Sequence, residues 1–419
     1  MVQPQSFASR YALAFIFVTM LVDSIGLGVI IPVAPKIIAE LTAGGQSGAA
    51  AMSEAARWGG WLFFVYALMQ FLCAPLIGNL SDRFGRRPVL IASLLALGVD
   101  YAITGLAPTI GWLFAGRVLS GAAGASYTTA YAYIADVTPP EKRAANFGLA
   151  GAAFSIGFVL GPALGGLLGS MGARLPFFVA AGLALANALF GAFALTESLT
   201  KEHRRPFELW RANPAGALVA LGKFPNIATM CAVIVLVRLA HDSNPSVFSF
   251  YVYAKFHWTP QMVGYALMTV GAFMAVVYGF LVRVTIPRIG ETAAVYVGLG
   301  AGAVGFAGYA FATKGWMMFA WTAPFSLFGF VMPALNAIMS KTVGPREQGE
   351  LQGALACIGS LTSIAAPPML TNLFAFFTSP VAPVYFPGAA FLAASLFLLL
   401  AAVVFSRIRA PAPALQPAQ

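Results

Sequence analysis

The chain alternates between long apolar stretches and short polar ones. Twelve of the apolar stretches are long enough to cross about 30 Å of hydrocarbon as helices of roughly 20 residues. Gly and Ala occur throughout them, and the regular alternation required by strands of a membrane barrel is absent, so the pattern predicts helices. The predicted spans lie near residues 11–34, 58–79, 89–108, 111–134, 144–168, 174–196, 224–253, 260–282, 292–312, 316–340, 350–376 and 383–406.

The longest polar interruption runs from Thr196 to Lys223 and divides these spans six and six. A Gly-, Ala- and Ser-rich stretch at 39–57 is expected to be a flexible loop after the first span. The pattern predicts an N-terminal six-helix bundle (1–196), a cytoplasmic central linker (197–223), a C-terminal six-helix bundle (224–409) and a disordered Pro/Ala tail (410–419).

The two halves share short similarities at an offset of 205 residues. The stretch Pro139–Gly148 recurs as Gly344–Gly353, and the same offset carries Pro162 onto Pro367. Two related six-helix halves around a cavity at the middle of the membrane are typical of a transporter, rather than of a receptor or a membrane enzyme.

Composition supports a chain embedded in lipid. Hydrophobic residues make up 59% of the sequence and charged residues 9%, far below the roughly 25% charged residues of soluble proteins. The predicted fold class is therefore all-α integral membrane. The net charge of +10 does not indicate nucleic-acid binding, because the Lys and Arg residues gather in short loops between apolar spans.

The basic residues also predict the orientation. With the N-terminus inside, 17 of the 24 Lys and Arg residues fall in inside segments and 5 in outside segments. Under the positive-inside rule both termini are predicted to be cytoplasmic, in a multi-pass protein of a bacterial cytoplasmic (inner) membrane. The sequence has no CxxC spacing, no clustered histidines and no ATP-binding Gly-x-x-x-x-Gly-Lys loop, so it indicates no metal site, no cofactor and no enzyme.

A dense group of charges lies between the second and third predicted spans. The charges are either solvated, as is usual for a polar loop, or held in a charge-assisted pair that gates the cytoplasmic side. The gate is the favoured interpretation, because glycines on either side permit a tight turn. The residues concerned are Gly78, Asp82, Arg83, Gly85 and Arg86, with Asp136 and Arg143 of the next cytoplasmic loop as expected partners.

The corresponding stretch of the second half differs. Gly279–Gly290 keeps the glycines and two arginines but has no aspartate. The comparison predicts a charged gate in the first half only.

Several motifs resemble the major facilitator superfamily. The loop Gly78–Arg87 is similar to the loop signature of that family, and Asp23–Pro35 resembles the first-span pattern of its drug:proton antiporter branch. Arg117 followed by Leu119-Ser-Gly121 is similar to the fourth-span arginine motif, and Gly157–Gly166 to the fifth-span motif of exporters. Asp100-Tyr101 makes the sequence most similar to the tetracycline-efflux subgroup. The resemblance implies twelve helices in two pseudo-symmetric six-helix bundles.

Three ionisable residues lie inside the first four spans, namely Asp23, Asp100 and Arg117. A charge at membrane depth costs roughly 2.5–3.5 kcal/mol or more, so it persists only where it is paired or lines a cavity. Each aspartate is either a proton carrier, which is favoured, or a structural hydrogen-bonding group. Arg117 is expected to hold Asp100 or Asp23, either as a static salt bridge or as a pair that protonation breaks.

The seventh span carries Arg238, His241 and Asp242 on one face of a helix. They form either a proton relay, through a histidine that titrates near neutral pH, or an ion pair of Arg238 with Asp242. The resemblance implies an acid in the ninth span, where this chain has Gly302, so the residue that carries the proton is left open.

Two further groups are candidates for gating and for substrate binding. Gly161 is expected to let helices approach closely, and Pro162 is expected to bend the fifth span. Both are therefore candidates for gating. The candidate substrate-binding residues are the polar and aromatic side chains Gln70, Tyr127, Tyr131, Asn187 and Asn336.

Together these features predict a secondary transporter that exports a hydrophobic or amphipathic drug, tetracycline-like or of several kinds. Export is expected to be coupled to proton entry by rocker-switch alternating access, so the proton gradient takes the place of a cofactor. The partners are the drug, protons and the lipid bilayer, and the protein is expected to be a monomer. The alternative is an exporter or importer of a non-drug metabolite such as a sugar or an organic acid.

Overall fold

The computed structural model describes residues 7–124, 126–200, 202, 204–205, 227–343 and 347–408. Within these ranges the chain is helical apart from short connections and contains no strand. Most of the predicted linker, residues 206–223, and the predicted tail at 410–419 lie outside the described residues.

The helices of the first half follow the predicted spans closely in order. They are α1 (Phe7–Ile30), α2 (Ala34–Thr42), α3 (Gly48–Phe84), α4 (Arg86–Leu106), α5 (Ile110–Gly124), α6 (Ser126–Val137), α7 (Pro140–Met171) and α8 (Leu175–Ala194).

The helices of the second half include one π-helical turn, η3, and one 3-10 turn, η4. They are α10 (Ile227–His241), α11 (Ser243–Phe256), α12 (Pro260–Val276), η3 (Val277–Leu281), α13 (Val282–Ile289), α14 (Glu291–Phe311), α15 (Trp316–Ser326), η4 (Leu327–Phe330), α16 (Val331–Thr342), α17 (Gln348–Thr378) and α18 (Ala389–Ser406).

The described helices confirm the predicted all-helical membrane fold. Ten helical runs are long and apolar enough to cross a membrane, and the pair α1–α2, bent by 47°, gives an eleventh. The helices α5 and α6 occupy the range of the fourth predicted span, on either side of residue 125. The seventh span is one run in the prediction, but in the structure it is broken at Asp242, between α10 and α11.

The prediction of a flexible loop at 39–57 is wrong. Helix α2 continues to Thr42 and α3 begins at Gly48, so only residues 43–47 connect them. Gly44 and Gly45 make this turn with positive φ angles of 52° and 90°, which glycine adopts without steric cost. The flanking segments are rich in Ala, the strongest helix former, and they remain helical although they are less apolar than the predicted spans.

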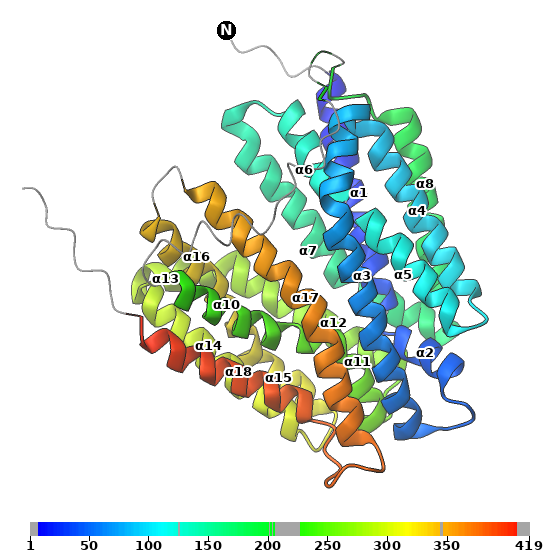
Figure 1. Ribbon diagram of the computed structural model, residues 1–419, viewed down its shortest axis with the longest axis vertical. Coiled ribbons are helices and arrows are strands. Elements are labelled where there is room, and N and C mark those ends of the chain that lie inside the picture. The colour runs from blue at the N-terminus through cyan, green and yellow to red at the C-terminus, as the bar shows by residue number, and fades with distance from the viewer. Residues whose placement is uncertain are drawn as a thin grey trace, which may run out of the picture.

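The two halves of the chain form two groups of helices that lie side by side (Figure 1). The first half, blue to green, is on the right in this view, and most of the second half, yellow to red, is on the left. We call the end of the molecule with the α2–α3 turn the Ser53 end, and the end with the α3–α4 turn the Arg86 end.

Close glycine contacts bring α7 against both halves. A Cβ on Gly161 would lie 2.7 Å from the Cα of Gly28 in α1, and a Cβ on Gly165 would collide with the carbonyl of Val29. On another face of α7, a Cβ on Gly166 would lie 2.7 Å from the carbonyl oxygen of Pro260 in α12. Helix α7 therefore joins the packing of the first half to the boundary with the second half.

The contacts between the halves that the structure describes cluster toward the Ser53 end. Ser53 of α3 donates a 2.8 Å hydrogen bond to the carbonyl of Ala375 in α17. Nearby, Gly60 is close enough to α17 that a Cβ would lie 3.0 Å from the Cα of Pro368. Tyr253 of α11 donates a 2.6 Å bond to the carbonyl of Pro32, between α1 and α2. The halves are therefore held together at the Ser53 end.

The sequence repeat at an offset of 205 residues reappears in the backbone. Gly85 precedes α4 with φ and ψ of 108° and 159°, and Gly290 precedes α14 with 80° and 159°. Beyond the next two spans, Arg143 donates to the carbonyl of Thr138 at 3.2 Å, and Gln348 donates to the carbonyl of Val343 at 3.4 Å. Each second-half residue of these pairs lies 205 positions after its first-half counterpart, so this offset relates equivalent positions of the two Arg86-end surfaces.

Candidate functional site

A cavity of about 430 Å³ lies between the two halves, on the Arg86 side of the contacts described above. Gln70 of α3 and Arg238 of α10 line it, together with Cys357, Ser360 and Ser363 of α17. A cavity with mainly apolar walls and a few polar groups is the usual form of a small-molecule binding site. Its position at the boundary of two helical halves is the one that transporters use for their substrates.

The charged residues of the seventh span lie at the helix break beside this cavity. The ion pair of Arg238 with Asp242, one of the two alternatives, is not formed among the described residues. Instead, Arg238 Nε and one carboxylate oxygen of Asp242 are buried without a hydrogen-bond partner in that part of the chain. Helix α10 ends at His241, and Asp242 turns the chain into α11. Buried unpaired groups of this kind are costly and leave bonding capacity for a ligand or water.

His241 lies apart from that arrangement. Its ring stacks on Phe328 of η4, with the ring centroids 6.2 Å apart and an interplanar angle of 24°. The residue itself is exposed. No hydrogen bond links His241 to Arg238 or Asp242 through side chains among the described residues, so the three residues do not form a direct relay in this conformation.

Asp100 of α4 and Arg117 of α5 form an ion pair of 2.9 Å inside the first half. The Asp100 side chain is completely buried, whereas the Arg117 side chain is 18% exposed. Thr104 donates a 3.4 Å hydrogen bond to the same carboxylate, and the Arg117 guanidinium lies 5.9 Å from the ring centre of Tyr66. Of the two expected partners of Arg117, the structure brings Asp100 to it.

Glycine makes room for this pair. A Cβ on Gly116 of α5 would collide with the Asp100 carboxylate, so only glycine allows α4 and α5 to approach here. Sequence reasoning missed Gly116. The small residue one position before Arg117 is the signal that could have found it.

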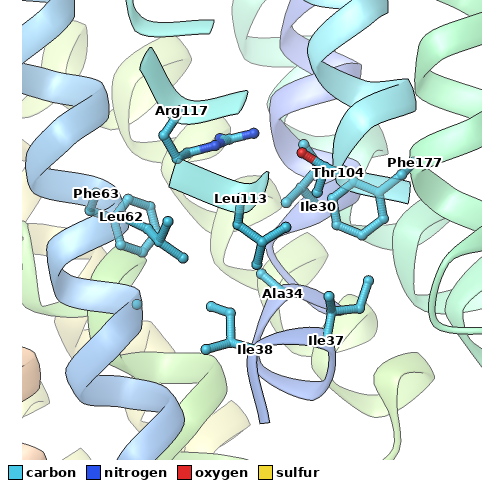
Figure 2. Close-up of a pocket in the computed structure, with 11 residues that line it drawn as sticks. Ile30, Ala34, Ile37, Ile38, Leu62, Phe63, Thr104, Leu113, Arg117 and Phe177 are labelled. Carbon is cyan, nitrogen blue, oxygen red and sulfur yellow. The ribbon is translucent and has the colours of Figure 1, made fainter. Parts of the chain in front are cut away.

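A small cavity of about 70 Å³ adjoins Arg117 and also Thr104, the α4 residue that bonds Asp100 (Figure 2). Figure 2 shows Arg117 at its rim and the apolar side chains of Ile38, Leu62 and Leu113 around it. The lining beside the ion pair is thus mainly apolar, with Arg117 and Thr104 as its polar members.

Asp23 of α1 is buried, with 8% of its surface exposed, but it forms no ion pair with a described residue. Tyr66, Tyr101 and Tyr127 lie within electrostatic range of its carboxylate. The structure thus separates the two buried aspartates of the first half into a paired one and an unpaired one.

Arg86 is the centre of the charge cluster at the Arg86 end. It donates 2.5 Å bonds to Ser81 and Asp82 and a 3.3 Å bond to Asp136 of α6. The predicted contact of Asp82 and Arg86 with Asp136 is therefore present. These contacts join α3, α4 and α6, all in the first half.

Glu197, just after α8, completes the cluster. Its carboxylate accepts bonds from the backbone N–H groups of Arg86 at 2.8 Å and Arg87 at 3.3 Å, at the N-terminus of α4. A negative group there is favoured by the exposed N–H groups and by the helix dipole. Gly85, with its positive φ, leaves room for this carboxylate. Sequence reasoning missed Glu197, because its partner lies more than a hundred residues away.

The other residues predicted for the cluster have different neighbours. Arg83 lies 5.2 Å from the ring centre of Phe84, and Arg143 bonds the carbonyl of Thr138 rather than the cluster. A Cβ on Gly78 would meet no atom within 4 Å, so no close approach requires glycine there.

The prediction of a charged gate in the first half only stays a prediction, but the second half does have a charged pair directly after this loop. Glu291 directly follows Gly290 and forms a 2.5 Å ion pair with Lys341 at the end of α16. The pair is equivalent in position to Arg86 and Asp136, but its charges are reversed.

Of the five candidate substrate-binding residues, Gln70 lines the cavity between the halves. Tyr127 packs on Phe154 at 6.0 Å, and Tyr131 on Phe147 at 5.7 Å. The remaining two are in other parts of the fold. Asn187 is buried and accepts a 3.5 Å bond from Thr19, and Asn336 of α16 is half-buried with its side-chain oxygen unpaired among the described residues.

Comparison with known proteins decides the family. The sequence profile of the Major Facilitator Superfamily matches residues 16–367. The chain belongs to the major facilitator superfamily. It is therefore a secondary transporter and not an enzyme.

Curated relatives include several bacterial resistance proteins. The chain is 39% identical over 367 residues to the class C tetracycline resistance protein of Escherichia coli, covering 88% of this chain and 90% of that protein. It is 37% identical over 364 residues to the class G tetracycline resistance protein of Vibrio anguillarum, covering 84% and 87%. These relatives support placing this multi-pass protein in a bacterial inner membrane.

Solved structures share the fold. A bacterial homologue of the human lysosomal transporter Spinster, in an inward-facing and unoccupied conformation, matches with a TM-score of 0.73 and 18% identity. The match covers 96% of this chain and 97% of that one. The human organic anion transporter MFSD10 (TETRAN) matches with a TM-score of 0.67 and 22% identity, covering 96% and 100%. At these identities the likeness concerns the fold alone.

Proposed function

We propose that this protein exports a hydrophobic or amphipathic drug of the tetracycline type, in exchange for protons, by alternating access. The observation that carries the proposal is the cavity between the two halves, with Arg238 in its wall and a buried polar atom of that residue unpaired. Similarity to the class C tetracycline resistance protein supports the substrate class.

The conformation fits one stage of such a cycle. The halves are in contact toward the Ser53 end, through Ser53 and Ala375 among others, and the cavity lies on the Arg86 side of these contacts. The distribution of basic residues supports a cytoplasmic position of the Arg86 end. The conformation is then inward-facing, and a drug enters the cavity from the cytoplasm.

Proton coupling is assigned to the buried acids of the first half. Asp100 is neutralised by Arg117 when it is ionised. Protonation of Asp100 removes its attraction for Arg117 and frees the guanidinium, which lines the small cavity of the first half. Asp23, which has no ion-pair partner among the described residues, is the second carrier. Asp242 and Arg238 are free to meet polar groups of the substrate.

The charge cluster around Arg86 stabilises the Arg86 end of the first half, where the cavity opens and closes to the cytoplasm. It ties α3, α4 and α6 to the segment after α8. Charge-assisted bonds of this kind keep the Arg86 end of these helices together as they tilt. The protein works as a monomer, because each chain contains both halves of the cavity.

Transport in inside-out membrane vesicles tests the proposal. With a pH gradient imposed, tetracycline is expected to accumulate in vesicles that contain the protein and not in vesicles that lack it. Dissipating the gradient with a protonophore is expected to abolish the accumulation. Accumulation that persists without the gradient would rule out the exchange with protons.

A further inference from the structure

A second large pocket, of about 570 Å³, lies at the Arg86 end of the first half. It is lined by the first three turns of α4, the end of α3 and the segment after α8. Helix α4 is on the side of the first half that faces away from most of the second half (Figure 1). The pocket shares no lining residue with the cavity between the halves, so the proposed transport leaves it without a role.

Two arginines line this pocket, Arg87 in the first turn of α4 and Arg204 after α8. Arg87 donates a 2.5 Å hydrogen bond to the carbonyl of Ala192, and the Arg204 guanidinium lies against the start of α4, where a Cβ on Gly85 would be 3.1 Å from its Nη2. The Nε atoms of both arginines are buried without a hydrogen-bond partner among the described residues. A small rotation of each side chain would present these N–H groups to a phosphate, whose oxygens bind guanidinium N–H groups in pairs.

The charge of the lining favours an anion. Glu197 is the one acid among the described lining residues, and its carboxylate already accepts bonds from the backbone N–H groups of Leu199 and of the first two residues of α4. Two arginines against one glutamate leave one positive charge in excess. Arg83 adds a cation at the rim, because its guanidinium lies 5.2 Å from the ring centre of Phe84, which lines the pocket.

Below the arginines the pocket continues into an apolar strip on α4. Ala92 and Leu95 line the pocket, and Val99 follows them on the same face of the helix. All three are exposed, Leu95 by 45% and Val99 by 46%, and α4 is one of the helices that are long and apolar enough to cross a membrane. A soluble phosphate compound would leave this strip uncovered, whereas a phospholipid has both a phosphate and acyl chains that cover it.

We propose that this pocket binds an anionic phospholipid, with Arg87 and Arg204 at its phosphate and an acyl chain along Ala92, Leu95 and Val99. Basic pockets at the membrane surface beside transmembrane helices are a recurrent form of headgroup site. The bound lipid joins the start of α4 to the segment that leads out of the first half. The site does not depend on the drug, on the proton or on alternating access.

Native mass spectrometry of the purified full chain tests the headgroup site. The protein in detergent is titrated with phosphatidylglycerol and with phosphatidylcholine of the same acyl chains. Phosphatidylglycerol is expected to bind at least about fivefold more tightly. Arg204→Gln and Arg87→Gln are each expected to weaken phosphatidylglycerol binding about fivefold, the effect of one basic residue at a membrane surface, and to leave phosphatidylcholine binding unchanged.

A matched control separates the pocket from a general loss of positive charge. Arg288→Gln removes the same charge from an exposed arginine of the second half that does not line the pocket, and it is expected to bind phosphatidylglycerol as the unchanged protein does. Arg204 lies outside the spans, so Arg204→Gln is expected to stay folded, which an unchanged Tm checks. Equal affinities for the two lipids, or equal effects of Arg288→Gln and Arg204→Gln, would overturn the proposal.

Photolabelling locates the lipid without any substitution. Phosphatidylglycerol with a photoactivatable group in one acyl chain is expected to label the stretch from Ala92 to Val99, and labelling elsewhere only would overturn the proposed site. Inorganic phosphate and glycerol 3-phosphate distinguish the source of the phosphate. Neither is expected to reduce the labelling at millimolar concentration, and displacement by either one would assign the pocket to a soluble anion instead of a lipid.

Discussion

The Arg117 guanidinium lies 2.9 Å from the Asp100 carboxylate, and only the arginine side of the pair has any exposure. The two partners are therefore unequal. Removing the arginine leaves an anion with no access to water, whereas removing the carboxylate leaves a cation that is 18% exposed and lies near the ring of Tyr66. Breaking a buried pair from one side typically costs about 3–5 kcal/mol, because the remaining charge stays uncompensated.

The first prediction concerns this asymmetry. Arg117→Ala is expected to destabilise the purified protein by about 3–5 kcal/mol, and Asp100→Asn by clearly less, because Asn keeps a polar group for Thr104. Thermal unfolding in detergent measures both as a fall in Tm. Asp100→Asn is also expected to abolish accumulation driven by a pH gradient while the protein remains folded.

The double variant Asp100→Asn/Arg117→Ala provides the control. It is expected to be more stable than Arg117→Ala alone, since no buried charge is left without a partner. Proton-coupled transport by Asp100→Asn at the level of the unchanged protein would remove Asp100 from the coupling and leave Asp23 as the carrier.

The second prediction separates Arg238 from Asp242. Arg238→Ala and Asp242→Asn are each expected to weaken tetracycline binding by about 10- to 100-fold, as is usual for a lost hydrogen bond to a charged group. Titration of the purified protein with tetracycline, followed by fluorescence, gives the dissociation constants. The effects of the single variants are not expected to add fully in the double variant, because the two charges are one helical turn apart and act on each other.

Lys314→Ala, an exposed residue far from the cavity, is the matched control and is expected to bind tetracycline unchanged. Full additivity in the double variant would show that the two residues act on tetracycline independently of each other. Unaltered binding by both single variants would remove them from the substrate site.

The spans and the buried charges could be predicted because membrane burial makes them conspicuous in sequence. A charged residue inside an apolar run, such as Asp100 or Arg117, needs a partner or a cavity, and the structure pairs these two. The end of α2 and the start of α3, within residues 39–57, could not be predicted from hydrophobicity. These segments are helical because they are rich in Ala, not because they are strongly apolar.

The remaining errors concern contacts between distant segments. Glu197 caps α4 from the far end of the first half, and no local pattern marks it. The second-half charged pair was not predicted, because the segment equivalent to the first-half loop has no aspartate. The repeat keeps the positions of Glu291 and Lys341 but reverses the charges, which only the contact in the folded chain makes visible.

The third prediction tests the glycine contacts of α7. Gly165→Val would drive a side chain into the carbonyl of Val29 in α1, where the backbone leaves no room. The variant is expected to be destabilised by about 1–3 kcal/mol or more, as for other overpacked sites. Gly151→Val in the same helix is the control, because a Cβ there meets no atom within 4 Å. Equal Tm values for the two variants would contradict the packing shown.

The fourth prediction concerns the contact between Ser53 and Ala375, which joins α3 to α17 across the two halves. If the halves must separate there to release the drug, cross-linking them blocks transport. Ser53→Cys/Ala375→Cys, in a background without the three native cysteines, is treated with a short bifunctional reagent that forms a disulfide bond with each thiol. Accumulation of tetracycline in inside-out vesicles is expected to be lost after cross-linking and to return after reduction of the cross-link.

A cross-link within one half distinguishes this block from damage by the reagent. Glu40 and Arg174 lie at the same end of the molecule, form a 2.9 Å ion pair and both belong to the first half. Glu40→Cys/Arg174→Cys is therefore expected to cross-link as readily and to keep transporting, because a rigid first half can still tilt against the second. Full transport with Ser53 and Ala375 cross-linked would mean that the Ser53 end does not open during the cycle, and the path of the drug would have to be sought elsewhere.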